Sequence, residues 1–572
     1  MRFRRQVCSA AVASLLSVTI ARAQSPATSV TPPPLVPPNL LAGTPFQLDE
    51  MSKESLSEIE GSPLVLREAV ATALATSPEI REQLLGPVVS DAELEARKGV
   101  YALSFFADLS GEHQVLPEAS ALAGTSSTDA KLLQFGGGLE QPIPVGGGQV
   151  TLGLENQIVE TNSSYVSLSP EYVPVLSLEL KQPLLKNLLI DQSRAQIRLA
   201  ELERTRSSLT LAQTVRDVTR TVEGDYWELY FAMQQVRINR LALELGKTLL
   251  GNDRRRFEVG VLPRPDLLDD EASVANLDDE LVRTRSVLRA ASDQLRRDLG
   301  LGLAGPGLLA ADLPEGVTLP TEPVDAIVAK ALASREELAR ASAEVEQRGV
   351  DSELAENQRL PSIDLTADAK LDGISGSGRA VDFGGVTLDS PFVGDFGDSY
   401  HQLVSGDFYD LFAGVRITIP LTSSEADHEA QVAHLKGKTA ERTLERLKRD
   451  VDLEVRRAHD NLTTAVARIG TSGVALDRAR ENLESEAKRY SLGASRTDDV
   501  IRKIESYARA LGTFNRAQAD ARIAGAQLDR VSANNLERLG ITVPKSSDSK
   551  RPSPEDVIRG TAEAPAPHMA PH

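Results

Sequence analysis

The chain has little cysteine and few aromatic side chains. Its 572 residues include a single cysteine, Cys8, and aromatic residues make up only 4%. Because Cys8 lies in a predicted signal segment, we expect a mature chain without thiols, which excludes disulfides, cysteine-bound metals and cysteine nucleophiles. The low aromatic content also argues against a large globular core in one isolated chain.

Basic clusters and long apolar runs are lacking as well. The net charge is −19, and the Lys and Arg residues alternate with acids. Phosphate contacts need clustered Lys and Arg, so we expect no nucleic-acid partner. After the signal, no segment reaches the roughly 18 consecutive apolar residues of a transmembrane helix. If the chain crosses a membrane, it must therefore do so as strands of a closed barrel.

Motifs for catalysis and for cofactors are missing too. No Gly-rich phosphate loop follows a predicted strand, and no nucleophile has a plausible base beside it. The histidines are scattered, and the spacing of His428 and His434 does not suit one helical face. The sequence predicts no enzyme activity, no metal and no cofactor.

The N-terminus has the pattern of a secretory signal. Arginines at positions 2, 4 and 5 precede a short apolar run and an A-x-A site that ends at Ala23. This pattern predicts a signal peptide over 1–23 with cleavage after Ala23. Residues 24–60 are rich in Pro, Ser and Thr and predict an extended segment, and 542–572 predicts a disordered tail.

A long predicted helix with a coiled-coil pattern occurs twice, over 193–257 and 425–490. In both, apolar residues alternate at spacings of three and four, which is typical of a coiled-coil seam. In the first helix these seam residues are Leu211, Val215, Val218, Val222, Tyr226, Leu229, Met233 and Val236. We interpret Tyr226, Trp227 and Tyr230 as packing residues.

Both long helices end in the same kind of turn. In the tips 258–266 and 491–499, a basic residue and an aromatic precede a Gly, and an Asp follows it. Gly260 and Gly493 are therefore predicted to cap the helices in the left-handed conformation. Shorter helices, predicted over 266–299 and 499–539, complete two antiparallel hairpins.

The segments before the long helices repeat as well. The sequence of 66–80 matches that of 324–338, and both predict the start of a helix. The first of these helices is predicted to reach Lys98 with a break at Gly86-Pro87. The chain thus reads as a duplication with a first repeat, 61–302, a linker, 303–322, and a second repeat, 323–541.

Each repeat also contains strand patterns, over about 103–182 and 361–420. Apolar residues alternate there with other residues, which is typical of strands with two different faces. A loop rich in Gly, Asp and Ser is predicted over 373–406. Four strands per chain are clear, and the count becomes six if the segments around Phe135 and Val150 are both strands.

So few strands cannot close a barrel alone, since bacterial barrels have at least about eight. Left open, their edges would expose unpaired backbone groups to lipid. We therefore expect several chains to share one barrel. The predicted fold class is helical plus transmembrane β-barrel, internally duplicated, with the shared barrel continued by a long antiparallel coiled-coil tunnel.

Several motifs carry a resemblance to a known family. They are the strand-to-helix junction Gln182-Pro183-Leu184-Leu185, the helical segment Asp225-Tyr226-Trp227-Glu228-Leu229, the two Gly-x5-Asp turns and the helix start Ser77-Pro78-Glu79-Ile80. Over about 64–541 the chain resembles the TolC-like outer-membrane efflux proteins. The second repeat departs from the pattern, because Ile419-Pro420-Leu421 lacks the glutamine.

The resemblance implies an assembly and partners. Proteins of this family form homotrimers, with a twelve-stranded barrel in the outer-membrane lipid of Gram-negative bacteria and a periplasmic helical tunnel. They passively conduct substrates delivered by a periplasmic adaptor protein and an inner-membrane pump or transporter. The same location and partners are the expectation for this chain.

The resemblance also assigns roles to the two tips. It implies that they dock on the adaptor, which gives the contact candidates Gly260, Val261, Leu262, Gly493, Ala494 and Ser495. It further implies an aspartate-lined periplasmic aperture, with the candidates Asp499, Asp266 and Asp269, although Arg502 stands where a second aspartate would follow Asp499. The simpler interpretation of these carboxylates is favourable charge at helix N-termini.

Two other functions compete with the export duct. A periplasmic adaptor is also secreted and helical, but it would need only one hairpin, flanked by compact β domains. A secreted structural coiled coil would need no alternating strands. Two hairpins, each preceded by strands, favour the duct.

Overall fold

The computed structural model describes residues 60–117, 126–314, 316–383, 386–422 and 425–541. The predicted signal peptide, the segment before Glu60 and the predicted tail lie outside these residues. Two compact units are present, and both predicted repeats contribute to each of them. Among the described residues, the helical unit contains 60–89, 205–342 and 443–541, and the sheet unit contains 90–204 and 343–442.

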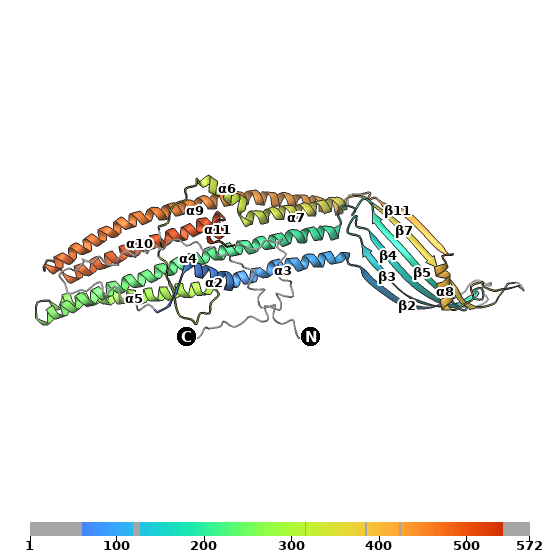
Figure 1. Cartoon of the computed structure of the whole chain (residues 1–572), viewed down its shortest axis with the longest axis horizontal. Helices are drawn as coiled ribbons and strands as arrows, with labels where there is room; N and C mark the ends of the chain where they lie inside the picture. Colours follow the sequence, from blue (N-terminus) through green and yellow to red (C-terminus); the bar gives the residue numbers. More distant parts are fainter. Residues whose placement is uncertain (1–59, 118–125, 315, 384–385, 423–424, 542–572) are drawn as a thin grey trace. The chain divides into compact units, whose positions relative to one another are not determined.

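The two long helices and their shorter partners have matching lengths (Figure 1). Helices α4 (Gln192–Glu258) and α9 (Glu425–Ser491) each contain 67 residues. Helices α5 (Arg264–Asp298) and α10 (Thr497–Val531) each contain 35. Both shorter helices begin two residues earlier than the sequence predicted.

The second short helix also ends earlier than expected, because 499–539 is not continuous. Helix α10 stops at Val531, Ala533 has a positive φ of 58°, and a separate helix, α11 (Asn535–Leu539), follows. Arg216 of α4 donates hydrogen bonds to the Ala533 carbonyl at 2.8 Å and to Asn535 Oδ1 at 3.0 Å. This contact stabilises the bend and lets Leu536 enter the core.

The predicted break in the first helix was placed at the wrong proline. Helix α2 (Leu66–Thr76) is separated from α3 (Pro78–Lys98) at Ser77, and α3 continues through Pro87. Ser77 has a ψ of 127°, since a residue before proline is disfavoured in the helical conformation. The matching helices α6 (Val324–Ser334) and α7 (Glu336–Gln358) are separated at Arg335, the position equivalent to Ser77.

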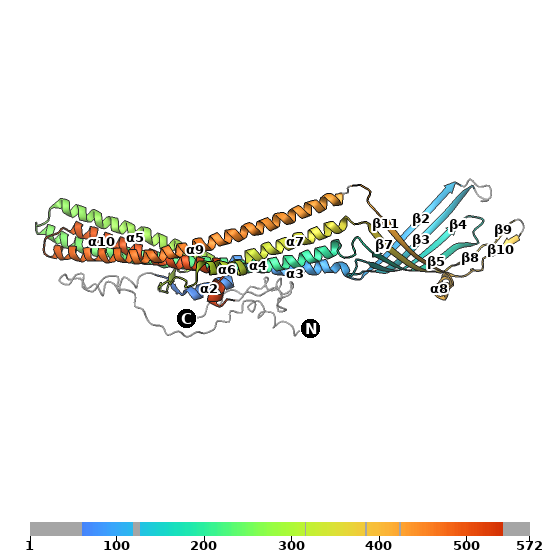
Figure 2. The same cartoon turned by 90° about the horizontal axis from the view of Figure 1, so that it is seen from above.

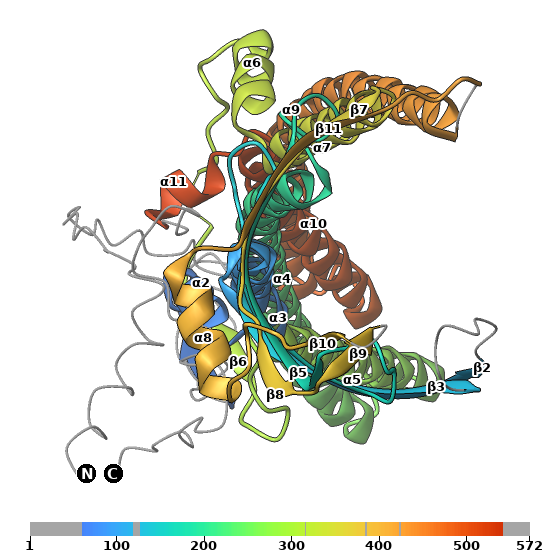
Figure 3. The same ribbon diagram turned by 90° about the vertical axis from the view of Figure 1, so that its right-hand side faces the viewer.

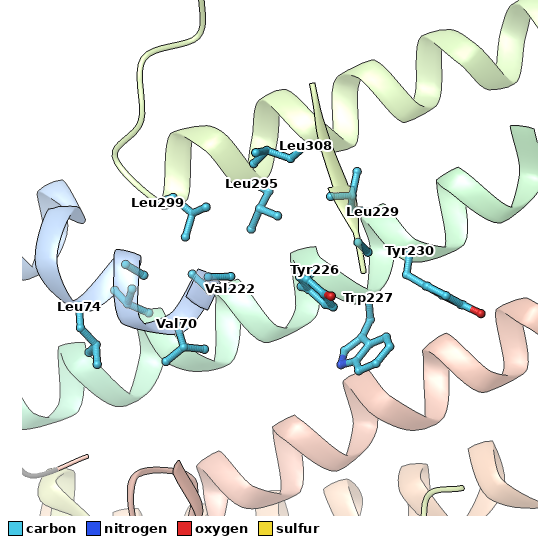
Figure 4. Close-up of a cluster of buried hydrophobic side chains, with 14 of the residues drawn as sticks. Val70, Leu74, Val222, Tyr226, Trp227, Leu229, Tyr230, Leu295, Leu299 and Leu308 are labelled. Atoms are coloured by element: carbon cyan, nitrogen blue, oxygen red, sulfur yellow. The ribbon is translucent and has the colours of Figure 1, made fainter. Parts of the chain in front are cut away.

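The largest core of the helical unit lies around the first seam. All eight predicted seam residues of α4 are buried, which confirms that seam, and Trp227 and Tyr230 are buried beside it. Figure 4 shows Val222, Tyr226 and Leu229 of α4 near Leu295 of α5 and Leu299, the residue that follows α5. Burying a large apolar side chain contributes about 1.5–3 kcal/mol, so this seam holds the hairpin together.

The region predicted as a linker contains ordered structure. Residues Leu308–Ala310 form strand β6, which pairs in parallel with β1 (Ser62–Leu64). The Tyr226 hydroxyl donates to Asp312 Oδ2 at 2.7 Å and accepts from the backbone N–H of Asp312 at 3.0 Å. Burial is the main reason that the pKa of this tyrosine is raised. The hydroxyl ties this small parallel pair to α4.

The sheet unit is built on antiparallel strands in the order β11-β7-β5-β4-β3-β2 (Figure 1 and Figure 2). The strands are β2 (Ser104–Pro117), β3 (Ser127–Pro142), β4 (Gln149–Thr161), β5 (Leu168–Pro183), β7 (Ser362–Asp372) and β11 (Tyr409–Thr418). The segments around Phe135 and Val150 are both strands, so this path contains six strands among the described residues. A further short strand, β8 (Ser375–Gly378), pairs with β5.

The predicted loop 373–406 is not without structure. Besides β8 it contains a short hairpin of β9 (Val381–Phe383) and β10 (Val386–Leu388), and a helix, α8 (Phe396–Ser405). The Asp395 side chain accepts from the Asp398 backbone N–H, while the Asp398 side chain accepts from the Asp395 N–H. This capping box is a sequence signal for a helix start that the loop composition concealed.

The two faces of the sheet differ in polarity. Residues opposite one another on paired strands share a face. One row across all six strands is apolar and consists of Phe105, Leu139, Leu152, Leu178, Ala369 and Leu411. The next row, on the other face, is largely polar and consists of Ser104, Glu140, Thr151, Glu179, Asp368 and Phe412. We call these the apolar face and the polar face.

In the described part of the chain, no helix has the length and apolar character to cross a membrane.

Candidate site at the hairpin tips

The two hairpin tips have the same backbone hydrogen bonds. At the first tip, the Gly260 N–H donates to the Phe257 carbonyl and the Val261 N–H to the Arg256 carbonyl, both at 2.9 Å. At the second, the N–H groups of Gly493 and Ala494 donate to the carbonyls of Tyr490 and Arg489, again at 2.9 Å. Paired bonds of this kind form the Schellman motif, which needs a left-handed residue after the helix.

The glycines are the residues that meet this requirement. Gly260 has a φ of 76° and Gly493 a φ of 72°, as expected for the two caps. No other atom lies within 4 Å of the position where a Cβ would be at either glycine. The conformation, and not a lack of space, therefore makes glycine the suitable residue here.

Several apolar side chains at the tips are exposed. They include Val259 and Val261 at the first tip and Leu492 at the second. Of the other contact candidates, Ala494 is exposed, whereas Leu262 and Ser495 are half-buried. Ser495 hydrogen bonds to Glu486, which lies near the end of α9. Both tips thus present apolar side chains on a stiff turn, which suits contact with another protein.

An arginine connects the two tips. Arg496 lies 3.7 Å from Asp266 Oδ1 of the first hairpin, measured from its Nη1 atom. Its backbone N–H also donates to Asp499 Oδ2 at 3.4 Å. Two of the three aperture candidates, Asp266 and Asp499, are therefore brought to the same arginine. The third, Asp269, is exposed on α5.

The charge of Asp499 is compensated within its own helix. Arg502 contacts Asp499 Oδ1 at 2.5 Å and also forms an ion pair with Asp498. The hydrogen bond from Arg502 is the main reason that the pKa of Asp499 is lowered. The arginine at the place of the family's second aspartate thus offsets the charge of the first.

A buried carboxylate pair near the first tip is absent from the sequence prediction. The Asp253 side chain of α4 is 1% exposed, and Asp270 of α5 is 3% exposed. The pKa of Asp270 is raised to about 7 by burial, by its hydrogen bond with Asp253, and by the charges of Asp253, Asp498 and Asp266. Asp253 also forms an ion pair with Arg256 at 3.1 Å. The sequence signal for this pair is Asp253 itself, because an acid three residues after the buried Leu250 lies on the buried side of the helix.

This pair predicts a pH dependence of stability. An aspartate whose pKa rises on folding binds a proton more tightly in the folded state, so its stabilising effect is lost as the pH rises through about 7. We expect the thermal midpoint of the purified protein to fall as the pH rises from about 4 to about 7 and to level off above that. The Asp270→Asn variant should show a smaller fall, because the amide needs no proton.

A second carboxylate of the same hairpin provides an additional test of this prediction. Burial and the neighbouring Asp298 raise the pKa of Asp225 to about 7 as well. The Asp225→Asn variant should therefore also reduce the slope, and the double variant should have the flattest profile. Equal slopes in the wild type and the double variant would contradict this account.

No metal centre accompanies these carboxylates in the described ranges. No group of three or more His, Cys, Asp or Glu side chains there could hold a metal ion.

Comparison with known proteins gives a result only at the level of structure. No protein-family model and no curated protein sequence matches the chain. The outer-membrane channel CmeC of Campylobacter jejuni matches with a TM-score of 0.59 and 14% identity, covering 85% of this chain and 90% of that channel.

Two further outer-membrane proteins have similar scores. The open state of the MtrE outer-membrane channel of Neisseria gonorrhoeae matches with a TM-score of 0.56 and 15% identity, covering 82% of this chain and 89% of that one. The outer-membrane protein VceC of Vibrio cholerae matches with a TM-score of 0.56 and 15% identity, covering 84% and 97%. At such low sequence identities, the structural similarity establishes the fold alone. The chain therefore has the fold of the TolC-like outer-membrane channels.

Proposed function

We propose that this chain is the subunit of a homotrimeric export duct in the outer membrane of a Gram-negative bacterium, with its helices in the periplasm. In this proposal the duct conducts substrates passively and has no enzymatic activity. The structural neighbours are outer-membrane channels, which favours this role over a periplasmic adaptor or a secreted coiled coil.

The open sheet is the observation that carries the proposal. Strand β2 pairs with β3 and β11 pairs with β7, so β2 and β11 are the two edges of the described sheet. Both edges carry exposed apolar side chains, including Leu109 on β2 and Ile417 on β11. Long edges of this kind are ready to pair with another chain. Pairing of β2 with β11 of the next copy would satisfy both edges and leave the apolar face toward lipid.

The number of strands suggests a wider barrel than the resemblance implied. Six strands from each of three copies would give eighteen strands, whereas the family pattern implies twelve. Barrel diameter grows roughly in proportion to strand number, and barrels of about 16–18 strands enclose an aqueous channel. In this proposal the hairpin β3–β4 is the insertion that widens the barrel.

In this proposal the hairpin tips contact the partner proteins. The exposed side chains beside Gly260 and Gly493 would contact a periplasmic adaptor, which in turn connects the duct to an inner-membrane pump or transporter. The contact candidates remain Val261, Leu262, Ala494 and Ser495 with the two glycines. Asp266, Asp269 and Asp499 are proposed to line the periplasmic aperture, with the charge of Asp499 reduced by Arg502.

Cross-linking between copies tests the shared barrel. Strand β2 begins soon after α3, and β11 ends shortly before α9. Phe105 and Ile417 would therefore lie at the same level on adjoining edges. In a Phe105→Cys/Ile417→Cys variant, a short bis-maleimide should join the two edges between copies. We expect covalent dimers and trimers on a denaturing gel of outer-membrane preparations.

The controls use the low cysteine content of the chain. Cys8 is the only natural cysteine and lies in the predicted signal, so the reagent should react only with the introduced thiols. A Phe105→Cys/Tyr409→Cys variant places the second thiol at the opposite end of β11 and should give little product. Protein that stays monomeric, or bands that continue beyond the trimer, would contradict a closed trimer.

A further inference from the structure

Helix α8 lies on the apolar face of the sheet. Its Phe396 ring is 5.5 Å from the Tyr172 ring of β5 and 6.2 Å from the Phe135 ring of β3, measured between centroids. The Tyr400 hydroxyl is 2.5 Å from Oδ1 of Asn156, a buried residue of β4. Figure 3 shows α8 on the convex side of the curved sheet.

The seat of α8 is closely fitted. The capping box of Asp395 and Asp398 fixes its start, and Gly406, with a φ of 69°, ends it. A Cβ at Gly373, just after β7, would lie 2.1 Å from the Ser399 carbonyl oxygen, so the helix can pack there only against glycine. Leu403 is buried in the same contact. The helix is thus a fixed part of the sheet unit.

The position of α8 coincides with the end of the apolar band. On β7 the apolar face runs from Ile363 to Leu371. Gly373, which packs against α8, lies two residues further along the chain. That run has the length of one membrane-crossing strand, about 9–11 residues. On β5, Leu176, Leu178 and Leu180 lie in the band, whereas Tyr172 lies beside α8. This end of β5 is the one remote from α4.

The outer side of α8 differs from the band that it adjoins. Asp398, His401 and Ser405 are exposed there together with Val404, whose exposed fraction is 81%. Charged and polar side chains of this kind are costly within lipid hydrocarbon. Aromatic rings gather around the same place: Tyr172, Phe396 and Tyr400 contact one another in series, and Phe392 packs on Phe408. Aromatic residues concentrate at membrane–water boundaries.

We infer that α8 is an interfacial helix that rests among the lipid headgroups of the leaflet farther from the periplasmic helices. It covers the last part of the apolar face. Its inner side packs on the sheet, and its outer side contacts the lipid headgroups. It thereby sets how deeply the barrel sits in the bilayer. This inference rests on the proposed function, since it needs the apolar face to contact lipid.

Depth-dependent fluorescence quenching tests the inference on the full trimer in phosphatidylcholine vesicles. Trp227 is the only natural tryptophan, so a Trp227→Phe background provides a dark reference. A Val404→Trp substitution then reports on α8. We expect a larger loss of fluorescence with a quencher attached to the lipid headgroup than with one placed deep in the acyl chain.

Two neighbouring positions on β5 provide the controls. Leu178→Trp, on the apolar face, should lose most fluorescence with the deep quencher, whereas Glu179→Trp, on the polar face, should be insensitive to both. If Leu178→Trp is quenched and Val404→Trp is not, α8 lies in water and this inference is wrong, while the barrel stands. If Leu178→Trp is also unquenched, the proposed function itself fails. Deep quenching of Val404→Trp would overturn the headgroup position.

Discussion

Replacing Arg335 with methionine is expected to lower the free energy of unfolding of the helical unit by about 3 kcal/mol. The Arg335 side chain is 5% exposed and contacts Glu337 at 2.9 Å and Glu454 at 2.5 Å. Arg530 also contacts both glutamates, at 3.3 and 3.0 Å. Removal of Arg335 leaves the poorly solvated Glu337 and the half-buried Glu454 to share one arginine, which is why the loss should be large.

The pH dependence of this variant separates lost charge from lost packing. Burial alone would raise the pKa of Glu337, but hydrogen bonding and charge from Arg335, together with Arg530, lower it. A depressed carboxylate pKa contributes stability that disappears as the pH falls through that value. The deficit of Arg335→Met should therefore be largest at neutral pH and shrink below about pH 4.

An exposed arginine serves as the control for this substitution. Arg283 pairs with Asp279, but its side chain is 70% exposed, so solvent screens the pair and Arg283→Met should leave the stability almost unchanged. Thermal unfolding of the detergent-solubilised variants measures both effects. Equal losses in the two variants, or a deficit that does not vary with pH, would show that the buried ion pairs do not carry the stability.

Replacing Gly493 with valine is expected to open the second tip and to abolish the proposed export, while the proposed trimers still assemble. A β-branched residue at a φ of 72° costs about 1–3 kcal/mol, and the open space around the position offers no compensating contact. The last turn of α9 should fray, and the surface proposed to contact the adaptor should lose its shape. Trypsin should then cut more rapidly after Arg489 and Arg496.

Two substitutions control for the size of valine and for the loss of glycine. Gly493→Asn should keep the tip intact, because asparagine tolerates the left-handed conformation. Gly470→Val places valine on the exposed side of α9, where no atom lies within 4 Å of the new Cβ and the backbone is helical, so it should be nearly neutral. Unchanged proteolysis and export in Gly493→Val would remove the tip from the proposed mechanism.

Local patterns in the sequence predicted much of the secondary structure. The spacing of apolar residues in α4 anticipates its buried seam, since a coiled-coil stripe is set by helical periodicity alone. The two tip glycines are equally readable, because a Gly after an aromatic and a basic residue is a local helix stop. Alternation in the strands likewise anticipates the apolar and polar faces.

Contacts between distant residues explain the predictions that were wrong. Helix α10 stops at Val531 because Arg216, more than three hundred residues earlier, hydrogen bonds to the bend at Ala533. Strand β6 forms in the predicted linker because Ser62–Leu64 pairs with it. Helix α8 needs Gly373 and the aromatic rings of β3 and β5 to hold it. The local sequence does not show which distant residues will contact a segment.

By itself, the sequence determined the two long helices, their glycine caps and the alternating polarity of the strands, because each depends on neighbours a few residues away. Only the tertiary structure decided that the two compact units each combine both repeats. It also decided that Arg496 meets Asp266 and that Asp253 and Asp270 share a buried site. The physical reason is that these pairings join separate helices, and their register is set by side-chain packing across the whole hairpin.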